Sequence, residues 1–503
     1  MMSMLPGNSQ CTNYHRRDRI YSVRRLIALW DLDALAACVH FDAGRSIAGR
    51  NKFGPYSCIT GLIFKNALSR PSIYKPARSI SMLHKGKLQA ALNLKRGQFS
   101  LYDGTFSEQL KEYQHALETL YLRYPTSATL EHVLPPDRIG MPSAGARPSI
   151  EFDRWLVNAA QRRYHGPVFP FGREFANHEQ ARQWAECIEG VTTLAVDGSQ
   201  LQPWRDASIP VALIQVGFFI NPHMHGRPYT KDVRMDVLAP DEIMEESKNE
   251  SADPDSYPYS EMQVTLRRYL LEIETLCSQM EQCANARHSG DPVYSPVVFF
   301  DGSLVVSFAL TMPSPYRERY IASAVSLLKI SEQLRVPLIG YIDTSYARDI
   351  ITMLRRLDAL QSQPVLRETK KIHDALLWQG RLQWGDRTPA MICARGDILE
   401  SYGPYRESVA FCYLQTTSRR PPARLEFPRW MLDDGVLEPV LDIVRAEVIA
   451  GNGYPYAIET ADAVSVITMQ DRDEFYAQFQ DFMEKQGVKF TFSTKSVSKS
   501  RRR

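Results

Sequence analysis

The sequence predicts an α/β protein. Apolar, strand-like runs alternate along the chain with segments whose apolar residues recur at helical spacing, which is typical of this class. Two of the strand-like runs, 194–199 and 297–303, end in the same tripeptide, Asp-Gly-Ser. At 503 residues, the chain is long enough for several domains and a large core.

Composition favours an intracellular protein. Hydrophobic residues make up 44% and charged residues 23%, as in ordinary globular proteins. No apolar run approaches the roughly 18 residues that cross a bilayer, and the start of the chain lacks a signal-peptide pattern. The eight cysteines form no CxxC pair, which favours free thiols in a reducing compartment. We therefore expect a cytoplasmic protein without a membrane segment.

The net charge of +3 is unevenly distributed. Residues 1–80 carry 12 Lys or Arg against 4 Asp and no Glu, and residues 485–503 carry 7 basic residues and no acidic ones. The remainder, 81–484, is left at −12. Binding of nucleic acid would therefore need a local basic groove, the basic termini, or metal ions that bridge to phosphate.

The first 81 residues differ in composition from the rest of the chain. They are rich in Arg, Ser and Cys and show little periodicity, so we interpret 1–81 as a basic extension outside the functional protein, with a genuine basic arm as the alternative. An amphipathic helix begins near Met82 and another covers 106–124, which predicts a helical N-terminal region over 82–165. Pro and Gly in 134–150 indicate a connector.

The next region, 166–475, alternates strands and helices. We expect helices at 173–190, 261–283, 322–334, 347–360 and 436–450, and strands at 194–199, 209–220, 297–303, 336–342 and 408–416. The first two strands are separated by a short polar loop, which predicts an antiparallel hairpin. The stretch 241–260 is acidic and predicts an inserted loop, and 476–503 predicts a basic, disordered tail.

The paired Asp-Gly-Ser tripeptides are compatible with two kinds of chemistry. Asp197 and Asp301 each follow a buried-type strand, where carboxylates make good ligands for a hard divalent cation. Asp-Gly is also ordinary turn chemistry, because Gly supplies a positive φ and Asp caps the turn.

Further acidic residues are candidates for the same site. Glu272 lies near the edge of the apolar face of helix 261–283, with Glu274 as a neighbouring alternative; from the residues alone, solvated helix charges are the favoured interpretation of both. Asp462 follows the turn Gly453-Tyr-Pro among small apolar residues, a setting in which an unpaired carboxylate is costly to bury. A metal ion, a helix cap or a structural salt bridge would each explain it.

Taken in order, these motifs resemble the NurA family of DNA end-processing nucleases. The resemblance covers roughly residues 83–468 and rests on eight segments: Asp197-Gly-Ser, Arg268-Tyr-Leu-Leu-Glu272, Phe-Phe-Asp301-Gly-Ser-Leu304, Leu338-Ile-Gly-Tyr-Ile-Asp343, Ile372-His-Asp374-Ala, Gly385-Asp-Arg387, Arg424-Leu-Glu426-Phe-Pro-Arg-Trp430 and Gly453-Tyr-Pro.

The resemblance implies an RNase H-like core, a mixed sheet flanked by helices. It also implies manganese-dependent cleavage of DNA, a homodimer, and partnership with a HerA-type hexameric ATPase in DNA end resection. Asp197, Glu272 and Asp301 match the metal-binding carboxylates of the family. Asp462 lies where its members commonly have a histidine; aspartate favours Mn²⁺ or Mg²⁺ but is a poorer proton shuttle at neutral pH.

The chemistry of phosphodiester hydrolysis suits these residue types. Two divalent ions, Mn²⁺ or Mg²⁺, held by Asp197, Glu272, Asp301 and Asp462 would activate water and stabilise the transition state. Arg387 and Arg424 are candidate phosphate contacts, with structural pairing, such as Arg424 with Glu426, as the alternative. Tyr454 and Trp430 are candidates for base stacking, with core packing as the alternative for Trp430.

Two other functions remain open from the sequence. One is a catalytically weak or inactive RNase H-like clamp that adapts DNA to the ATPase. The other is an actin-like or sugar-kinase-like phosphotransferase, whose Asp-Gly-Ser turns would cradle ATP, although no Gly-rich adenosine-binding stretch is found.

Overall fold

The computed structural model describes residues 83–136, 142–153, 168–173, 180, 184, 186–244, 259–288, 296–417 and 420–493. Two compact units are distinguished, with a boundary between Gln109 and Leu110 inside one helix. The basic extension 1–81, most of the expected helix 173–190 and most of the acidic stretch 241–260 lie outside the described residues.

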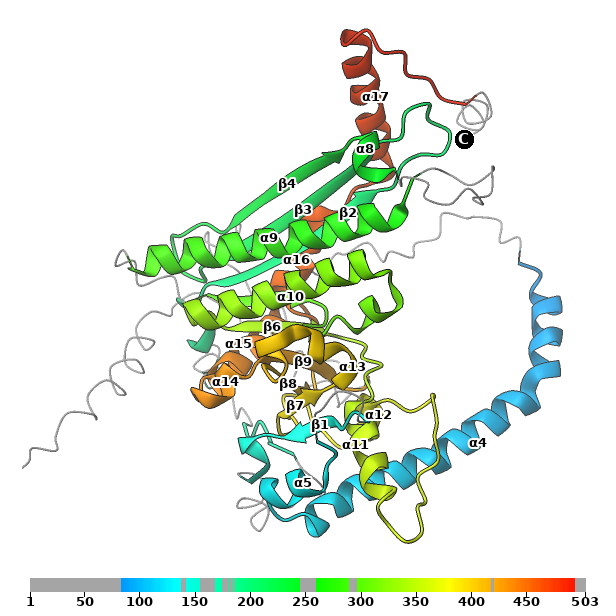
Figure 1. Cartoon of the computed structure of the whole chain (residues 1–503), viewed down its shortest axis with the longest axis vertical. Helices are drawn as coiled ribbons and strands as arrows, with labels where there is room; N and C mark the ends of the chain where they lie inside the picture. The colour runs from blue at the N-terminus through cyan, green and yellow to red at the C-terminus, as the bar shows by residue number, and fades with distance from the viewer. Residues whose placement is uncertain are drawn as a thin grey trace, which may run out of the picture. The chain divides into compact units, whose positions relative to one another are not determined.

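In the described part of the chain the strands form one nine-stranded sheet, in the order β1-β7-β8-β9-β6-β5-β2-β3-β4 (Figure 1). The strands are β1 (Gly145–Pro148), β2 (Thr193–Leu201), β3 (Ala212–Asn221), β4 (Thr230–Leu238), β5 (Val297–Asp301), β6 (Leu338–Ile342), β7 (Met391–Ala394), β8 (Val409–Leu414) and β9 (Ala423–Pro428). Strand β1 lies where a connector was expected, and it pairs antiparallel with β7.

Half of this sheet has the RNase H-like topology. Strands β2, β3 and β4 form an antiparallel meander, and β2 then pairs in parallel with β5, which pairs in parallel with β6. The predicted α/β, RNase H-like fold class is therefore confirmed, as is the hairpin of the first two strands. Strands β9, β8, β7 and β1 extend the sheet beyond β6 with antiparallel pairs.

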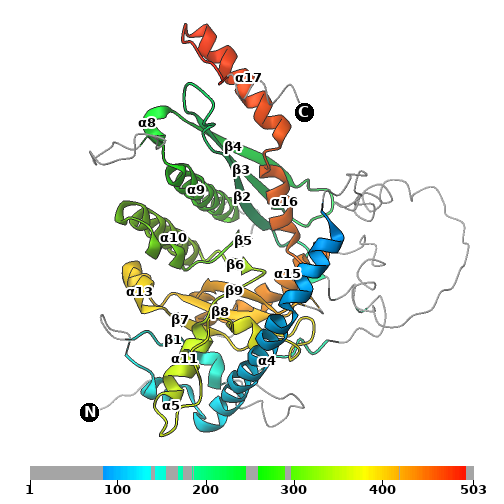
Figure 2. The same ribbon diagram turned by 90° about the vertical axis from the view of Figure 1, so that its right-hand side faces the viewer.

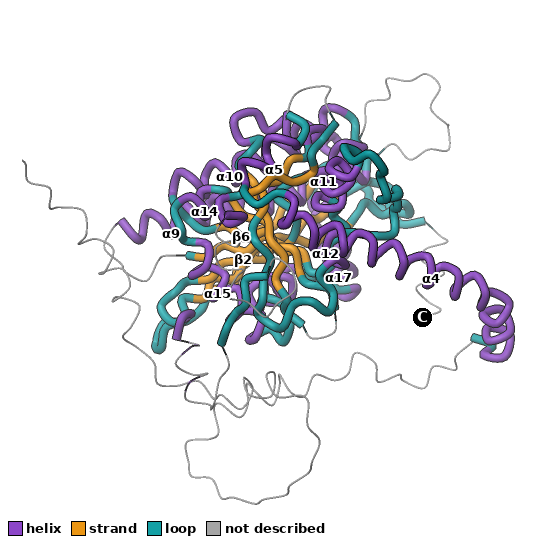
Figure 3. The backbone as a smooth tube through the Cα atoms, turned by 90° about the horizontal axis from the view of Figure 1, so that it is seen from below, coloured by secondary structure: helices purple, strands orange, loops and turns teal. Residues whose placement is uncertain are grey.

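Helices cover both faces of the sheet. Figure 2 shows the sheet close to edge-on, with α9 (Glu261–His288) and α10 (Ser314–Leu334) on one side and α15 (Leu437–Ala450) and α16 (Tyr456–Ser465) on the other. Helices α9 and α16 both contact β2 and β3, from opposite faces. The strands consequently lie in the interior between helices, as the view along the perpendicular direction also shows (Figure 3).

Some of the remaining helices match helices that were predicted from the sequence. The described helices not yet given are α4 (Lys85–Arg123), α5 (Ser127–Val133), α8 (Pro240–Ile243), α11 (Asp349–Asp358), α12 (Asp374–Leu377), α13 (Gly396–Leu399), α14 (Trp430–Asp433) and α17 (Met469–Lys485), with 3₁₀ turns at Glu186–Ile188, Ser307–Thr311 and Glu400–Tyr405. No helix of the described residues is both long and apolar enough to span a bilayer.

The expected tail boundary at residue 475 falls inside α17. This helix runs to Lys485, and the chain after it returns to pair at an isolated bridge between Phe492 and Ala207. Tyr476 and Phe490 are buried with Val211 in a small apolar cluster. The described part of the tail is therefore packed rather than disordered, because its aromatic residues cover the connection between β2 and β3.

Candidate active site

The two Asp-Gly-Ser aspartates lie side by side on adjacent parallel strands. Val196 of β2 is in register with Phe300 of β5, so Asp197 and Asp301 occupy the next register position. Neighbouring strands are about 4.8 Å apart, and residues in register point to the same face of a sheet. Strand β5 ends at Asp301, whereas β2 continues to Leu201. The edge of β2 that pairs with β5 is therefore unpaired with β5 beyond Asp197.

Glu272 reaches the same place from helix α9. Its side chain is buried, and its carboxylate lies against the backbone of Gly198, where any Cβ atom would collide with Glu272 Oε1. Arg268, one helical turn earlier, forms an ion pair with Glu272 and donates a hydrogen bond to the carbonyl oxygen of Gly198 at 3.1 Å. Glycine in the first tripeptide therefore permits the helix carboxylate to approach the strand.

Helix α16 brings Asp462 to the site by a second close approach. Gly217 of β3 pairs with Asp197, and a Cβ atom on Gly217 would lie 2.7 Å from the amide nitrogen of Ser465. The Ser465 hydroxyl lies 3.4 Å from Asp197 Oδ2 and donates to the Asp462 carbonyl oxygen at 3.0 Å. The Asp462 side chain is exposed. The structure thus places Asp301 and Asp462 within electrostatic reach of Asp197, and Glu272 within reach of Asp197 and Asp301.

Burial, with a smaller contribution from neighbouring carboxylates, raises the pKa of three residues of this cluster. Burial raises the pKa of Asp197 to about 6, and Asp301 and Asp462 add to this effect against a hydrogen bond from the Gly198 amide. Burial also raises the pKa of Glu272 to about 8; Arg268 opposes the shift, and Asp197 and Asp301 reinforce it. The pKa of Asp301 is raised by burial and by Asp462, against a hydrogen bond from Tyr454. The cluster carries more negative charge than its protein partners neutralise.

Asp343 is a fifth carboxylate at this edge. It directly follows β6, and its charge adds to the raised pKa of Asp301. Its side chain is 28% exposed and lies 3.3 Å from the exposed guanidinium of Arg420. The sequence contained the signal, an apolar strand followed at once by Asp, but this residue was not among the predicted ligands.

Tyr454 contacts the site through its hydroxyl group. It donates a hydrogen bond to Asp301 Oδ1 at 2.8 Å, and its ring packs against the ring of Tyr341 with centroids 5.2 Å apart. Tyr454 therefore holds one of the carboxylates in place. Trp430 is 7% exposed and donates to the Ser331 hydroxyl at 3.2 Å, which places it in the core, as the alternative interpretation proposed.

Arg387 and Arg424 are buried and paired, which does not fit a role as phosphate contacts. The Arg424 side chain is 1% exposed and pairs with Asp349 and Glu426, both at 2.8 Å. The Arg387 side chain is 4% exposed and pairs with Glu151 and Glu438, both at 2.7 Å. Both arginines are surrounded by carboxylates and cut off from solvent, so structural pairing is what the structure contains.

Glu426 connects this buried pairing to the second tripeptide. Its Oε2 atom accepts hydrogen bonds from the Ser303 hydroxyl at 2.8 Å and from the Leu304 amide at 2.7 Å, while Oε1 accepts one from Arg424. Arg424 and Glu426 are two residues apart on β9 and so share a face of the sheet. The Arg-Leu-Glu segment therefore fixes the turn that follows Asp301.

The donor set fits a hard divalent cation. Asp197, Glu272, Asp301 and Asp462 offer only carboxylate oxygens, the ligands that Mg²⁺ and Mn²⁺ prefer. Glu274 is paired instead with Arg267 at 2.9 Å and is half exposed. Among the described residues no three acidic, His or Cys side chains already converge at metal-binding geometry. The Glu272–Arg268 ion pair shows that binding would require this carboxylate to exchange partners.

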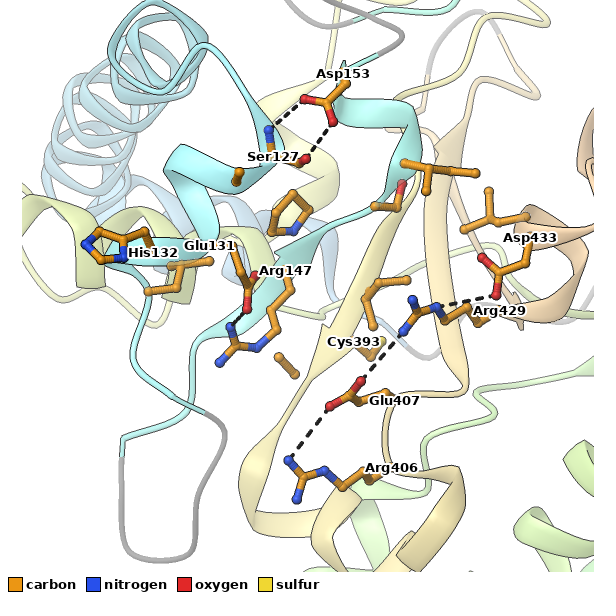
Figure 4. A pocket seen from close by; sticks show the side chains of 18 of the residues that line it. Ser127, Glu131, His132, Arg147, Asp153, Cys393, Arg406, Glu407, Arg429 and Asp433 are labelled. Carbon is orange, nitrogen blue, oxygen red and sulfur yellow. Dashed lines mark hydrogen bonds and ion pairs between the residues drawn. The ribbon is translucent and has the colours of Figure 1, made fainter.

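A cavity of about 860 Å³ lies elsewhere, beside the edge strand β1 (Figure 4). None of the candidate carboxylates lines it. Its charged side chains are paired among themselves, Arg147 with Glu131, and Arg429 with Glu407 and Asp433. The cavity therefore has no geometric connection with the carboxylate cluster.

Comparison with known proteins gives a family and several structural relatives. No curated protein matches the chain. Among solved structures it is similar to the NurA nuclease from Sulfolobus solfataricus, with 12% identity, coverage of 59% of this chain and 85% of that chain, and a TM-score of 0.38. It is also similar to NurA bound to dAMP and manganese, with 11% identity, coverage of 56% and 86%, and a TM-score of 0.27.

A third similar structure is the catalytic domain of human endonuclease V, with 15% identity, coverage of 68% of this chain and 100% of that chain, and a TM-score of 0.27. These superpositions are too loose to carry an argument about function. The NurA domain matches residues 191–467, which is more than half of the chain and contains all four candidate carboxylates. By this match, the chain belongs to the NurA domain family.

Proposed function

We propose that this protein is a divalent-metal-dependent nuclease that hydrolyses phosphodiester bonds in DNA. The observation that supports the proposal is the carboxylate cluster on β2, β5, α9 and α16, inside the NurA domain, in which burial and neighbouring carboxylates raise the pKa of Asp197, Glu272 and Asp301. Such a cluster is stabilised by cations, and phosphodiester hydrolysis by this class of site needs them.

Each residue has a distinct task in this proposal. Asp197 and Asp301, on adjacent strands, would hold Mn²⁺ or Mg²⁺ together with Glu272 from α9 and the exposed Asp462 from α16. Two ions bound there would supply an activated water and charge stabilisation. Tyr454 keeps one oxygen of Asp301 engaged, so that its other oxygen has a defined direction.

The wider biological role is proposed from the family. We propose that the nuclease acts as an exonuclease or single-strand endonuclease in DNA end resection, in the cytoplasm, as a homodimer together with a HerA-type hexameric ATPase. The NurA domain match supports this part of the proposal.

The decisive test is a cleavage assay with the full chain. Labelled single-stranded and double-stranded DNA are incubated with Mn²⁺ and wild-type protein, Asp301→Ala or Asp433→Ala. Asp433 is an exposed aspartate remote from the cluster, so its variant is the matched control. We expect Asp301→Ala to lose at least about a hundredfold in cleavage rate while it still binds DNA, and Asp433→Ala to retain the wild-type rate.

Other results would select other functions. DNA binding without cleavage by the wild type, even with the ATPase present, would support the inactive clamp and contradict the nuclease. ATP turnover by the isolated chain would support the phosphotransferase instead.

A further inference from the structure

Two exposed side chains beside the carboxylate cluster have no part in the chemistry described so far. They are Arg420, on the connection between β8 and β9, and Tyr346, on the loop that follows β6. Asp343 links both of them to the cluster. It is the first residue after β6 and lies two residues beyond Tyr341, which is in register with Asp301, and its charge acts on Asp301.

Arg420 lies at the edge of the sheet where β6 ends. Ile342, the last residue of β6, is in register with Arg424 near the start of β9, so the chain just before β9 runs beside Asp343. The Arg420 side chain is 72% exposed, and in the described part of the chain its guanidinium is paired with Asp343 alone, at 3.3 Å. Because a guanidinium has five N–H donors, most of them are available to a ligand.

The position of Arg420 is fixed by its backbone. Its amide donates to the Thr417 hydroxyl at 3.3 Å, and its carbonyl oxygen accepts from the Gln415 side chain at 2.9 Å. Unlike Arg387 and Arg424, which carboxylates neutralise in the interior, Arg420 therefore presents an accessible guanidinium beside the cluster. A guanidinium in such a place can bind a phosphate group through two parallel hydrogen bonds.

Tyr346 is exposed although its loop is anchored. The residue is 76% exposed, and its ring meets the ring of His373 edge-on, with centroids 5.3 Å apart. The carbonyl oxygen of the next residue, Ala347, accepts a hydrogen bond from the Asp374 amide at 2.9 Å, which ties the loop to the start of α12. A supported but accessible aromatic ring is what stacking of a nucleobase requires.

The two side chains are close enough to contact one short stretch of a nucleic-acid strand. Tyr346 is three residues from Asp343, so their Cα atoms are at most about 11 Å apart. A strand with the duplex rise of about 3.4 Å per nucleotide covers this distance in about three nucleotides. An unpaired base is free to stack on a protein ring, whereas a paired base must first leave its duplex at a cost in free energy. The arrangement thus favours a single strand.

We propose that Arg420 and Tyr346 form a binding subsite for an unpaired DNA strand beside the carboxylate cluster. Arg420 binds a backbone phosphate, Asp343 orients its guanidinium, and Tyr346 stacks on a base within about three nucleotides of that phosphate. The identity of the ligand rests on the proposed nuclease function. The subsite adds to that function a preference for single-stranded over double-stranded DNA.

Binding measured separately from cleavage tests the subsite. All variants are made in the full chain that carries Asp301→Ala, so that bound DNA stays intact, and fluorescence anisotropy follows the binding of oligo(dT) and of a blunt duplex with Mn²⁺ present. Tyr346→Ala should weaken oligo(dT) binding at least about fivefold and duplex binding by less than about twofold. Tyr346→Trp should restore oligo(dT) binding, since an indole also offers a stacking face.

Arg420→Gln tests the phosphate contact through its salt dependence. Loss of one phosphate contact should reduce the slope of log affinity against log salt concentration by about 0.7 for a single strand. A substitution that acted only on the structure would leave this slope unchanged, because the number of neutralised phosphates would be the same.

The matched controls are Tyr229→Ala and Arg429→Gln. Tyr229 is 59% exposed and precedes β4 at the end of the sheet where β2 begins, away from Asp197. The Arg429 side chain is 43% exposed, and the residue follows β9 at the end opposite Arg420. Both variants should bind oligo(dT) like the parent, with the parent's salt slope. Thermal unfolding checks that all variants are folded.

Each of three results would overturn the subsite: no oligo(dT) binding by the parent, equal oligo(dT) affinity before and after Tyr346→Ala, or an unchanged salt slope in Arg420→Gln. Failure of the nuclease proposal has a different signature. In that case the chain with native Asp301 does not cleave DNA, whereas the losses of binding in Tyr346→Ala and Arg420→Gln remain.

Discussion

Glu272 is a carboxylate held where water solvates it poorly and other carboxylates repel it. Its side chain is 8% exposed, and Asp197 and Asp301 reinforce the effect of burial, while Arg268 compensates only in part. Its pKa of about 8 means that the metal-free site favours the protonated form at neutral pH. Cation binding requires the ionised form, so metal affinity and the stability of the metal-free protein depend on pH in opposite directions.

The first prediction concerns this residue. Because the folded-state pKa is raised, ionisation of Glu272 destabilises the metal-free fold as the pH rises from about 4.5 to about 8. Between pH 5 and pH 8, the free energy of unfolding of the wild type should fall by on the order of 3 kcal/mol more than that of Glu272→Gln. The glutamine has the shape of the protonated carboxyl group and stays neutral at every pH. Thermal unfolding with a chelator at pH 5 and pH 8 measures this difference.

Manganese provides the complementary measurement. Mn²⁺ should stabilise the wild type at pH 8 much more than at pH 5, and should stabilise Glu272→Gln less than the wild type at either pH. Equal pH dependence of wild type and variant would show that Glu272 is not held in the environment described.

At the scale of elements, two glycines set how closely helices approach the sheet. Gly198 of β2 admits the carboxylate that α9 carries, and Gly217 of β3 admits the backbone of α16. The two helices lie on opposite faces, so the site is assembled from both sides of one pair of strands. A strand glycine often marks such a close approach of another group.

We therefore predict that Gly217→Ala separates α16 from β3. The added methyl group would lie 2.7 Å from the Ser465 amide nitrogen and 3.0 Å from the Ala461 carbonyl oxygen, both backbone atoms that cannot rotate away. The expected cost is about 1–3 kcal/mol in the free energy of unfolding, with weaker Mn²⁺ binding because Asp462 moves with the helix. Urea unfolding and metal titration measure the two effects.

The control for this prediction is Gly104→Ala in α4, where a Cβ atom would meet nothing. That substitution should leave metal binding unchanged and stabilise the helix by up to about 1 kcal/mol. If Gly217→Ala behaves in the same way as Gly104→Ala, close contact between α16 and β3 does not position the site.

At the scale of the whole molecule, the nuclease core is continued at both ends by chain outside the NurA match. Glu151, before the match, binds the buried guanidinium of Arg387, and α17, after it, supplies the aromatic residues that cover the β2–β3 connection. Trp204 in that connection packs against Tyr476 and Phe492, with ring centroids 5.2 and 5.0 Å apart. The boundary of the folded protein therefore lies beyond α17.

The stability of truncated chains tests whether the folded protein ends beyond α17 or at residue 475, the end predicted from the sequence. A chain ending at 475 loses Tyr476 and Phe490 and leaves Trp204 without its aromatic neighbours, so it should be destabilised by at least about 3 kcal/mol. A chain ending at 493 keeps the cluster and should unfold like the full chain. Urea unfolding followed by tryptophan fluorescence compares them; equal stability of both truncations would contradict the packed tail.

Sequence patterns identified part of the elements and the order of the principal candidate carboxylates, but not strands β1, β4, β7 and β9. Apolar runs, helical spacing and Asp-Gly turn chemistry are local properties, so they identified β2, β5 and α9 and the order of Asp197, Glu272 and Asp301 along the chain. The same order gave the family, which the NurA domain match confirms. The parallel register that places Asp197 next to Asp301 is a finding of the structure, because β3, β4 and α9 lie between the two strands in the chain.

Tertiary structure alone decided which charged side chains face the site and which are buried. Arg387 and Arg424 resemble phosphate contacts in sequence, but carboxylates that are distant along the chain, Glu151 and Asp349, neutralise them in the interior. Asp343 and the hydroxyl of Tyr454 both act on Asp301, although the three residues belong to separate segments of the chain. The physical reason is that burial and ion pairing depend on long-range neighbours, whereas a sequence pattern records only adjacent ones.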